Sequence, residues 1–355
     1  MVDIAVIPGD GIGNEIIPGV CNIIKNINDD INFYYYDISS NRYLKNNITI
    51  TDNEISELKN YKAILFGAIG DFRVKPGIME QNVILRLRKD LDLYLNVRPV
   101  SSLPKISKYN NVDLTIYREN KEDFYALIDG DLNANKTFTH RDNLNNYEIN
   151  ISGNANDEIH YNMGVLSRKN ITRFFKKVFD LIYMGRAVIA DKANAISMYS
   201  FWREIAMNES RNYEINTSFE YADSLAYNLI LDPKKYTNII APNLYGDILS
   251  DMTSALVGSL GYAPSANIGD KTAMFEPVHG SAPDIANHNI ANPVASILSG
   301  AMMLEYLDYR EDSKLIRNCL FKMLRNDILP VESGGTFGTK EFMDYINKIT
   351  VEARI

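Results

Sequence analysis

The acidic pair in the segment NLYGDILSD, residues 243–251, has the spacing of two ligands in one site. Asp247 and Asp251 lie four residues apart, and residues i and i+4 share one face of a helix. Two adjacent carboxylates repel each other unless a cation lies between them, and Mg²⁺ or Mn²⁺ prefers oxygen ligands of this kind. The spacing predicts a divalent-metal site on a helix that starts just after Gly246. The alternative is a solvated acidic face near a helix N-terminus.

Three arginines have positions that suit the recognition of a small acid. Arg88 lies near the end of a predicted helix from about 79 to 91, Arg98 ends the next extended stretch, and Arg118 ends a predicted strand over 112–118. Because a guanidinium group binds a carboxylate through two parallel hydrogen bonds, converging arginines favour a di- or tricarboxylic acid as ligand. Surface ion pairing is the alternative for each arginine taken alone.

Two further residues are candidates for proton transfer. Tyr125 follows Arg118 by seven residues, and a tyrosine beside cations can act as a general acid or base. Lys192, in ADKAN, follows a predicted strand over 187–190 and could accept a proton in a cleft. Asp223, in FEYADSLAYNL, is a possible third metal ligand. Core packing for the tyrosine and a solvated position for the lysine remain the alternatives.

The loop EPVHGSAPD, residues 276–284, consists largely of small residues and could let the backbone approach an adenine ring or a ribose. Asp284 could accept hydrogen bonds from a ribose 2′-hydroxyl and would repel a 2′-phosphate. A polar surface loop with one capping aspartate is the alternative.

The elements that must position these residues indicate an α/β fold. Strand-like stretches at 2–7, 61–67, 112–118, 187–190 and 237–241 alternate with helical stretches throughout the chain. Glycines at 9, 11 and 13 follow the first strand, but Asn14 stands where a G-x-G-x-x-G motif needs its last glycine. We therefore interpret PGDGIG as a turn that brings backbone close to another segment, not as a Rossmann fingerprint.

Composition narrows the class of protein. A length of 355 residues favours two domains, and 46% hydrophobic with 23% charged residues is ordinary for a globular chain. A net charge of −8 gives no support to nucleic-acid binding, and no apolar run approaches a bilayer-spanning length. Two cysteines without ligand spacing argue against a zinc site and fit a reducing cytoplasm.

Seven motifs together resemble the β-decarboxylating dehydrogenases, a family that includes isocitrate, isopropylmalate, homoisocitrate and tartrate dehydrogenases. They are PGDGIGNE, the RxxxxxxxxxRP spacing, RENKEDFY, DKAN, NLYGDILSD, GSLGYAPSANIGD and EPVHGSAPDIA, in the family's order. The resemblance covers residues 4 to about 344, except for an Asn-rich segment at 131–162, which we interpret as an arm of hairpin strands. Leu127 stands where the family usually has a glycine, which puts the loop beside Tyr125 in question.

The resemblance implies a two-domain fold with a mixed sheet flanked by helices, distinct from the Rossmann fold. We expect a large cofactor-side domain from residues 1–100 and 253–355, and a smaller dimerisation domain from 101–252. It implies a homodimer, because Lys192 and Asp223 would reach the partner's active site. The resemblance also implies the following roles: Arg88, Arg98 and Arg118 bind substrate, Asp223, Asp247 and Asp251 bind the metal, Tyr125 and Lys192 are the acid–base pair, and Glu276, His279, Gly280, Ser281, Ala282, Asp284, Ile285 and Asn292 contact the cofactor.

The resemblance also bears on cofactor and substrate. Asp284 and Ile285 stand where NADP-preferring relatives more often have Lys and Tyr, so we expect NAD. Ile84 and Leu85 lie four and three residues before Arg88, where two aliphatic side chains suit an isopropyl group better than an extra carboxylate. This favours 3-isopropylmalate over isocitrate or homoisocitrate, unless both residues are simply core. A non-catalytic regulatory subunit is the remaining alternative, and the retained Tyr125 and Lys192 argue against it.

Overall fold

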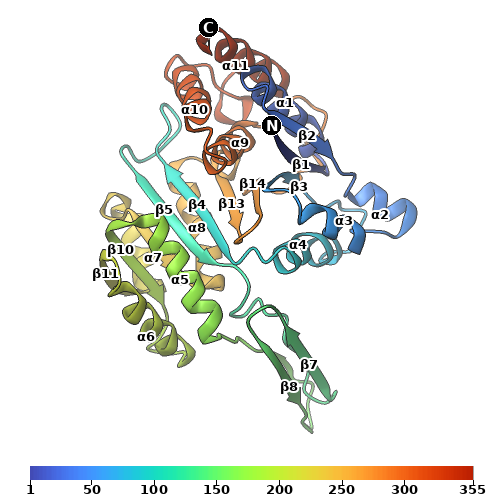
Figure 1. The fold of residues 1–355 in the computed structure, drawn as a ribbon, viewed down its shortest axis with the longest axis vertical. Helices are drawn as coiled ribbons and strands as arrows, with labels where there is room; N and C mark the ends of the chain where they lie inside the picture. The colour runs from blue at the N-terminus through green and yellow to red at the C-terminus, as the bar shows by residue number, and fades with distance from the viewer. Residues whose placement is uncertain (355) are drawn as a thin grey trace. The chain divides into compact units, whose positions relative to one another are not determined.

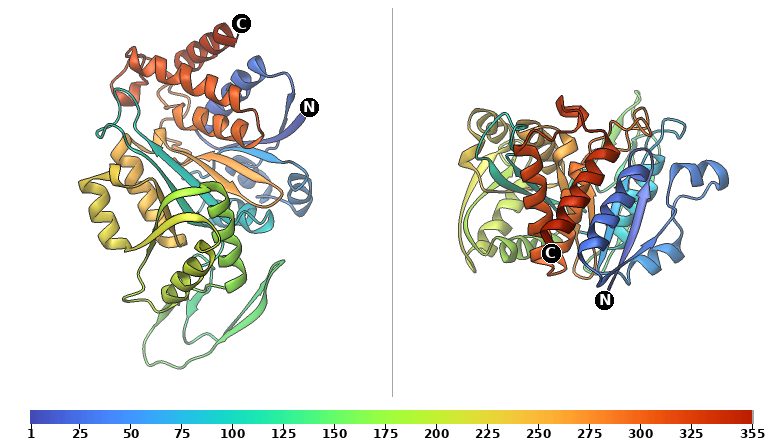
Figure 2. Two further views of the ribbon diagram at one scale, coloured as in Figure 1. Left: turned by 60° about the vertical axis from the view of Figure 1, so that its left-hand side comes forward. Right: turned by 90° about the horizontal axis from the view of Figure 1, so that it is seen from above.

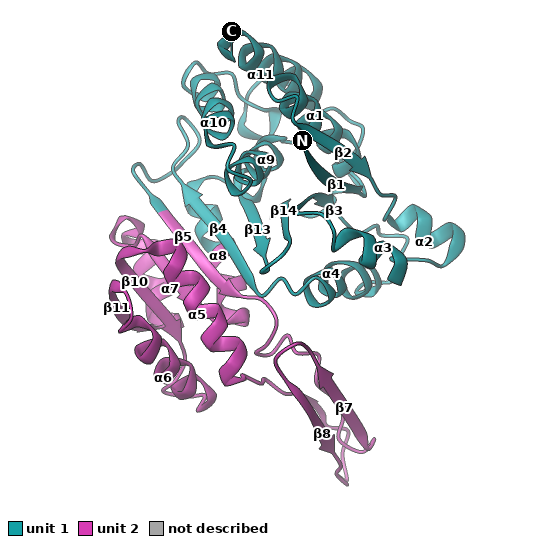
Figure 3. Ribbon diagram, in the orientation of Figure 1, with its two compact units in different colours: residues 1–113, 251–355 teal, residues 114–250 magenta. Residues whose placement is uncertain are grey.

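A computed structural model describes residues 1–354, which divide into two compact units. Of the described residues, unit 1 contains 1–113 and 251–354, and unit 2 contains 114–250 (Figure 3). The corresponding boundaries predicted from the sequence are 100/101 and 252/253. Both termini belong to unit 1, so the chain leaves this unit once and returns to it.

Unit 1 is built on six strands of a mixed sheet. Their order is β4 (Leu95–Ser101), β13 (Pro264–Ile268), β14 (Ala273–Pro277), β3 (Ala63–Ala68), β1 (Val2–Gly9) and β2 (Ile31–Tyr35). The strands β14, β3, β1 and β2 pair in parallel, whereas β13 is antiparallel to both of its neighbours. The segment VDIAVI is a nearly continuous apolar run because β1 is buried on both faces.

Helices cover both faces of this sheet (Figure 1). On one side, Ile7 of β1 and Phe66 of β3 pack in a cluster with Leu58 of α3 (Asp52–Leu58) and Leu87 of α4 (Arg86–Asp90). A second layer of helices packs on β13 and β14. The helices of this layer also pack on one another, with α1 and α11 side by side (Figure 2). That layer consists of α1 (Gly13–Ile27), α9 (Val294–Tyr306), α10 (Arg310–Arg325) and α11 (Thr339–Arg354). Among residues 1–354 no helix is long and apolar enough to span a membrane.

Unit 2 has an all-parallel sheet in the order β11 (Glu214–Tyr221), β10 (Met184–Asp191), β12 (Asn238–Ala241) and β5 (Asp113–Glu119). Its helices are α5 (Arg168–Ile182), α6 (Met198–Ser210), α7 (Ala222–Leu231) and the first part of α8 (Asn243–Val257). Trp202 of α6 is fully buried against Phe174 and Phe175 of α5, which makes this aromatic group the core between the two helices. The predicted α/β class with a mixed sheet is confirmed.

The Asn-rich segment forms two small antiparallel pairs. The hairpin β7 (Lys136–Arg141) with β8 (Asn146–Ile151) is the longer one, and β6 (Asp129–Asp131) pairs with β9 (His160–Asn162). Along β7 and β8 the side chains alternate between exposed and half-buried, as expected of a strand pair with one face in solvent.

Two predicted boundaries differ from the structure. The stretch ITRFFKKVFDLIYMG predicts a helix over about 171–185, but α5 spans Arg168–Ile182, because Tyr183 adopts a positive φ of 58° and β10 begins at Met184. The predicted helix at 79–91 is divided into a π-helix, η1 (Glu80–Leu85), followed by α4. Hydrophobic periodicity does not distinguish a π-turn from an α-turn, so the sequence carried no signal for this change.

Candidate functional site

Helix α8 begins four residues earlier than predicted, at Asn243, so Gly246 lies inside its first turn. The glycine is there for space. A Cβ atom on Gly246 would lie 2.6 Å from Cγ of Arg118, closer than non-bonded carbon atoms approach. Asp247 and Asp251 lie on the following turns with the predicted i, i+4 spacing, and their side chains are 32% and 53% exposed.

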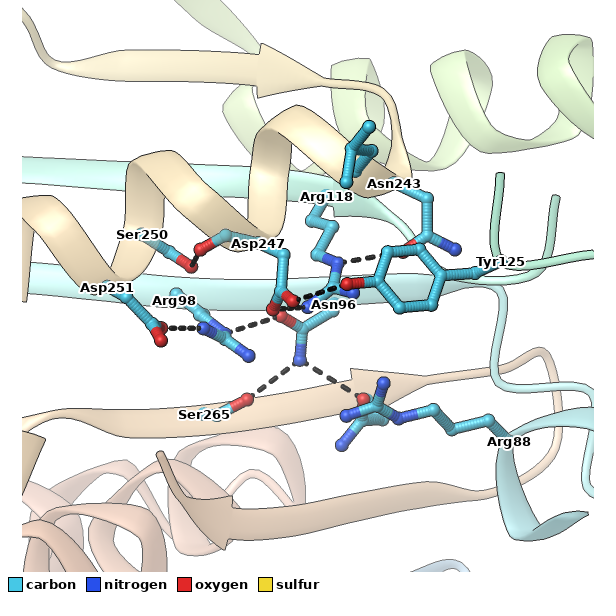
Figure 4. A network of polar contacts seen from close by, with 12 residues as sticks. Arg88, Asn96, Arg98, Arg118, Tyr125, Asn243, Asp247, Ser250, Asp251 and Ser265 are labelled. Carbon is cyan, nitrogen blue, oxygen red and sulfur yellow. Dashed lines mark hydrogen bonds and ion pairs between the residues drawn. The ribbon is translucent and has the colours of Figure 1, made fainter. Parts of the chain in front are cut away.

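Arg118 is held against the start of α8 by three contacts (Figure 4). Its Nε donates to Oδ1 of Asn243 at 2.9 Å, its Nη1 forms an ion pair with Asp247, and its Cζ lies 5.3 Å from the centre of the Tyr125 ring. The hydroxyl of Tyr125 donates to Oδ2 of Asp247 at 2.9 Å. A buried guanidinium, a carboxylate and a phenol of unit 2 thus form one hydrogen-bonded cluster.

The residue that departs from the family pattern near Tyr125 has a strained backbone. Leu127 has a φ of 57°, in the left-handed region, and its side chain is half-exposed. This conformation costs a non-glycine residue roughly 1–2 kcal/mol. The turn thus keeps a shape that suits glycine, although leucine occupies the position.

The acids between Arg118 and Tyr125 hold the surrounding backbone. Glu119 accepts the backbone N–H groups of Lys121 and Glu122 at 2.8 and 2.9 Å. Glu122 accepts from the N–H and hydroxyl of Ser167, the residue before α5, at 2.7 and 2.6 Å. Asp123 accepts from the N–H of Leu244 at the start of α8 at 2.9 Å and from the Tyr199 hydroxyl at 2.8 Å. Within RENKED, these three acids therefore tie one loop to two helix starts.

Lys192 and Asp223 form an ion pair within one chain, with Nζ and Oδ1 2.7 Å apart. Lys192 follows β10 and Asp223 lies in the first turn of α7. The hydrogen bond from Lys192 lowers the pKa of the Asp223 carboxyl. Asp191, which precedes the lysine, is fully buried and pairs with Arg203 through two contacts of 2.5 and 3.0 Å.

The structure does not gather the three predicted metal ligands in one chain. Among residues 1–354, the group of acids and histidine whose ligand atoms come within 4.8 Å of one another is Asp131, Glu158 and His160, on the arm. Asp247, Asp251 and Asp223 instead each pair with a cation: Arg118, Arg98 and Lys192.

The other two predicted arginines belong to unit 1. Arg98 on β4 pairs with Asp251 at 2.7 Å, and its Nε donates to Oδ1 of Asn96 at 2.9 Å. Arg88 on α4 lies 3.3 Å from Oε1 of Glu276. Ile84 and Leu85 take no part in these ion pairs. Both lie in η1 and are partly buried, and Ile84 packs against the core cluster of unit 1.

A buried polar network that sequence reasoning missed connects these groups. Asn96 donates to Ser265 at 2.7 Å and to Asn267 at 3.1 Å, and Asn267 donates to Glu276 at 2.7 Å. Glu276, predicted to contact the cofactor, therefore bonds Asn267 and Arg88. The available signal was the run of polar residues inside otherwise apolar strands, since a buried amide must find partners.

The predicted cofactor residues after β14 lie on an irregular loop. Ser281 is buried, Ala282 has a φ of 40°, and Asp284 is exposed. Burial lowers the pKa of His279, whose Nδ1 lies 2.9 Å from the Gly280 carbonyl oxygen. The remaining two residues bond locally, with Ile285 N donating to the Ala282 carbonyl at 3.2 Å and the buried Asn292 accepting from Val294 N at the start of α9 at 3.1 Å.

Burial of the Glu119 carboxyl makes the stability of the fold depend on pH. Burial first, and then the neighbouring Glu122 carboxylate, raise the pKa of Glu119 from 4.5 to about 8. Because the folded-state pKa lies above the ordinary value, the stability linked to this group is present below about pH 4.5 and is lost as pH rises through about 8.

We expect Glu119→Gln to remove that part of the pH dependence, so that its free energy of unfolding gains on the wild type between about pH 5 and about pH 8.5. Urea unfolding at both pH values measures the gain. Glu148→Gln, at an exposed glutamate of β8, is the control and should run parallel to the wild type. A parallel course for Glu119→Gln would contradict the expectation.

Comparison with known proteins adds independent information. The family model described as isocitrate/isopropylmalate dehydrogenase matches residues 3–346. The 3-isopropylmalate dehydrogenase of Methanothermobacter thermautotrophicus is 34% identical over 95% of this chain and 95% of its own. The homoisocitrate dehydrogenase of Methanocaldococcus jannaschii is 36% identical over 98% and 99%.

A solved structure agrees with these sequence relatives. The β-decarboxylating dehydrogenase of Thermococcus kodakarensis superposes with a TM-score of 0.80 at 31% identity, covering 99% of this chain and 97% of its own. The two sequence relatives are both named dehydrogenases, but their names give different substrates.

Proposed function

The chain belongs to the isocitrate/isopropylmalate dehydrogenase family, and from that premise we propose that it oxidises and decarboxylates 3-isopropylmalate with NAD and a divalent metal. The products would be 2-oxoisocaproate, CO₂ and NADH, a step of leucine biosynthesis. The observation that carries the proposal is the pairing of Arg98 and Arg118 with the carboxylates of Asp251 and Asp247. These residues supply both charges that a metal–carboxylate complex needs.

The paired charges are suited to an exchange of partners. Substrate carboxylates would take the guanidinium groups of Arg118 and Arg98, while the aspartates would turn to a cation. Each buried arginine would exchange one carboxylate for another, so that neither is left as an uncompensated charge. Arg88, whose partner Glu276 lies at 3.3 Å, would contribute the third guanidinium.

The donor set of α8 fits a magnesium or manganese ion. Asp247 and Asp251 offer hard oxygen ligands on one helix face, both partly exposed, and no sulfur or imidazole competes in the predicted set. When bound, the cation would polarise the 2-hydroxyl and its neighbouring carboxylate. Asp223 would be the third ligand, supplied by the partner subunit.

Lys192 and Tyr125 would move the protons. Lys192 would accept the proton of the 2-hydroxyl as hydride leaves C2. The carboxylate β to the new ketone would then leave as CO₂ from C3, the carbon next to the ketone. Tyr125 would deliver a proton to that carbon. Its ring lies beside the Arg118 guanidinium, and a neighbouring cation favours the phenolate that remains after a proton is delivered.

Asp284 supports NAD over NADP. It lies exposed on the loop after β14, where its carboxylate could accept from a ribose 2′-hydroxyl and would repel a 2′-phosphate. Substrate choice is supported by Leu85 more than by Ile84, because Ile84 also packs against the core of unit 1. The 36% identity with a homoisocitrate dehydrogenase makes homoisocitrate the second candidate.

A homodimer is supported by an apolar surface of unit 2. On α7, Tyr227, Ile230 and Leu231 are 64%, 51% and 61% exposed, and Ile248 on α8 is 57% exposed. Large apolar side chains in such a group favour a protein partner. A second copy of the chain would also account for the pairing of Lys192 with Asp223 outside the cluster around Asp247.

The substrate and cofactor are tested together in one assay. We expect NADH formation in the presence of Mg²⁺ or Mn²⁺ to show the highest kcat/KM with 3-isopropylmalate among isopropylmalate, homoisocitrate, isocitrate and tartrate. NADP should be the poorer cofactor with each acid. A higher kcat/KM for homoisocitrate or isocitrate would overturn the substrate assignment, and a preference for NADP would overturn the role of Asp284.

Tyr125→Phe tests the protonation step. Because only the later proton transfer needs the hydroxyl, kcat should fall by roughly 10²–10⁴, and the isotope effect of deuterium at C2 should approach one as hydride transfer ceases to limit the rate. Tyr213→Phe is the matched control, since the Tyr213 hydroxyl also lies 2.9 Å from an aspartate, Asp180, on α5. An unchanged kcat for Tyr125→Phe would contradict the assignment.

Complementation tests the shared active site. A purified heterodimer of one Asp247→Asn chain and one Lys192→Met chain should regain roughly half of the wild-type activity, because one of its two sites receives only intact residues. A heterodimer of Asp247→Asn with Tyr125→Phe should stay inactive, since both residues would come from the same chain of each site. An inactive first heterodimer would show that Lys192 acts within its own chain.

A further inference from the structure

The glycine turn after β1 contacts two other segments of unit 1. A Cβ atom on Gly9 would lie 1.8 Å from the Ala68 carbonyl oxygen, and one on Gly11 would lie 2.0 Å from that of Ser281. Gly11 also has a φ of 52°, a conformation that favours glycine. The backbone N–H of Ile12 donates to the same Ser281 carbonyl at 2.9 Å. The turn therefore meets the end of β3 and the loop after β14.

The Asp10 carboxylate lies at the centre of these contacts and is 3% exposed. It accepts from the N–H of Ser40 at 2.8 Å, from the Ser40 hydroxyl at 2.6 Å and from the N–H of Gly70 at 2.9 Å. Ser40 begins α2 (Ser40–Asn46), and Gly70 lies just after β3. One buried carboxylate with three donors thus joins the turn to two more segments, and hydrogen bonds to a charged acceptor are the stronger kind.

Gly70 links Asp10 to the loop after β14. The Ser281 hydroxyl donates to the Gly70 carbonyl at 2.5 Å, so Asp10 and Ser281 hold the two sides of the same residue. The loop needs such support because residues 278–293 contain neither helix nor strand. Three of its residues, Ala282, Asn287 and Asn289, have a positive φ that only a well-held loop maintains.

We propose that Asp10 is a positioning residue for nucleotide binding: through Gly70 and the glycine turn it holds Ser281 and the loop that follows in the shape that receives the nucleotide. This inference rests on the proposed function, in which the loop after β14 binds NAD. A loop that is ordered before the ligand arrives does not lose its conformational freedom on binding, so its order contributes directly to affinity.

The test compares two buried aspartates of unit 1. Asp10→Asn keeps the size of the side chain but replaces one acceptor oxygen by an NH₂ group, which faces donors it cannot bond. We expect NADH to bind roughly tenfold more weakly, measured by nucleotide fluorescence in the dimeric protein, with KM for NAD raised to match. KM for the acid substrate and kcat at saturating NAD should stay near the wild-type values.

Asp312→Asn is the matched control. Asp312 is 4% exposed and bonds Asn28 at 2.7 Å and Arg354 at 2.5 Å. Neither of these partners belongs to the loop after β14. Both variants should lower the thermal midpoint, but only Asp10→Asn should weaken NADH binding. Ser40→Ala removes one of the three donors and should show a smaller effect in the same direction, which keeps the test decisive if Asp10→Asn does not fold.

Two outcomes separate the inference from the function on which it rests. Wild-type protein that binds no NADH would overturn the proposed function. Wild-type protein that binds NADH, with Asp10→Asn or Ser40→Ala binding it as tightly as Asp312→Asn does, would overturn the positioning role of Asp10 alone.

Discussion

Charge compensation around helix α8 is the constraint on which the rest of the candidate site depends. A buried guanidinium such as Arg118 is costly without an anion, and a pair of carboxylates on one helix face is costly without cations. Both costs are met by ion pairs along α8: Asp247 pairs with Arg118 and Asp251 with Arg98. Asn243 orients Arg118, Gly246 leaves room for its side chain, and Asp247 neutralises it. The order of residues in NLYGD therefore follows from one ion pair.

Other carboxylates of this acidic chain are buried, where they accept hydrogen bonds that hold the backbone in place. Asp123, Glu122 and Asp10 are buried, and each accepts at least one backbone N–H from a segment distant in sequence. Asp123 and Glu122 do so at the starts of α8 and α5, where the helix dipole also favours an anion. Of the side chains expected to do chemistry, Arg118 lies near the end of β5 and Tyr125 on the loop that follows, which Asp123 and Glu122 hold in place. Rigid support of this kind is what a binding site built at strand ends requires.

The features that could be predicted are those that periodicity and spacing report. The i, i+4 pair on α8 and the parallel strands with continuous apolar runs, such as VDIAVI, follow from local rules. The predicted start of α8 was wrong by four residues because glycine usually marks a helix boundary, whereas Gly246 is required by a neighbour 128 positions earlier in the chain. The network of Asn96, Asn267 and Glu276 depends in the same way on pairings between strands, and no single stretch of sequence contains them. The hydrogen-bond partners of Asp10 could not be predicted from the sequence either, although its glycine turn was interpreted as a point of close backbone approach.

The distinction between residues that are tied to distant partners and residues that are not also bears on how substrate choice can change within the family. Relatives with 34% and 36% identity to this chain carry the names of different substrates, so overall identity does not decide the substrate. The arginines that would bind the shared part of the substrate are tied to partners by ion pairs and, for Arg98 and Arg118, to asparagines as well. Leu85 instead ends a π-helix, a rare conformation that is frequently found at functional sites. A side chain there can be exchanged without breaking an ion pair, so the recognition of different acids can change while the charged framework stays the same.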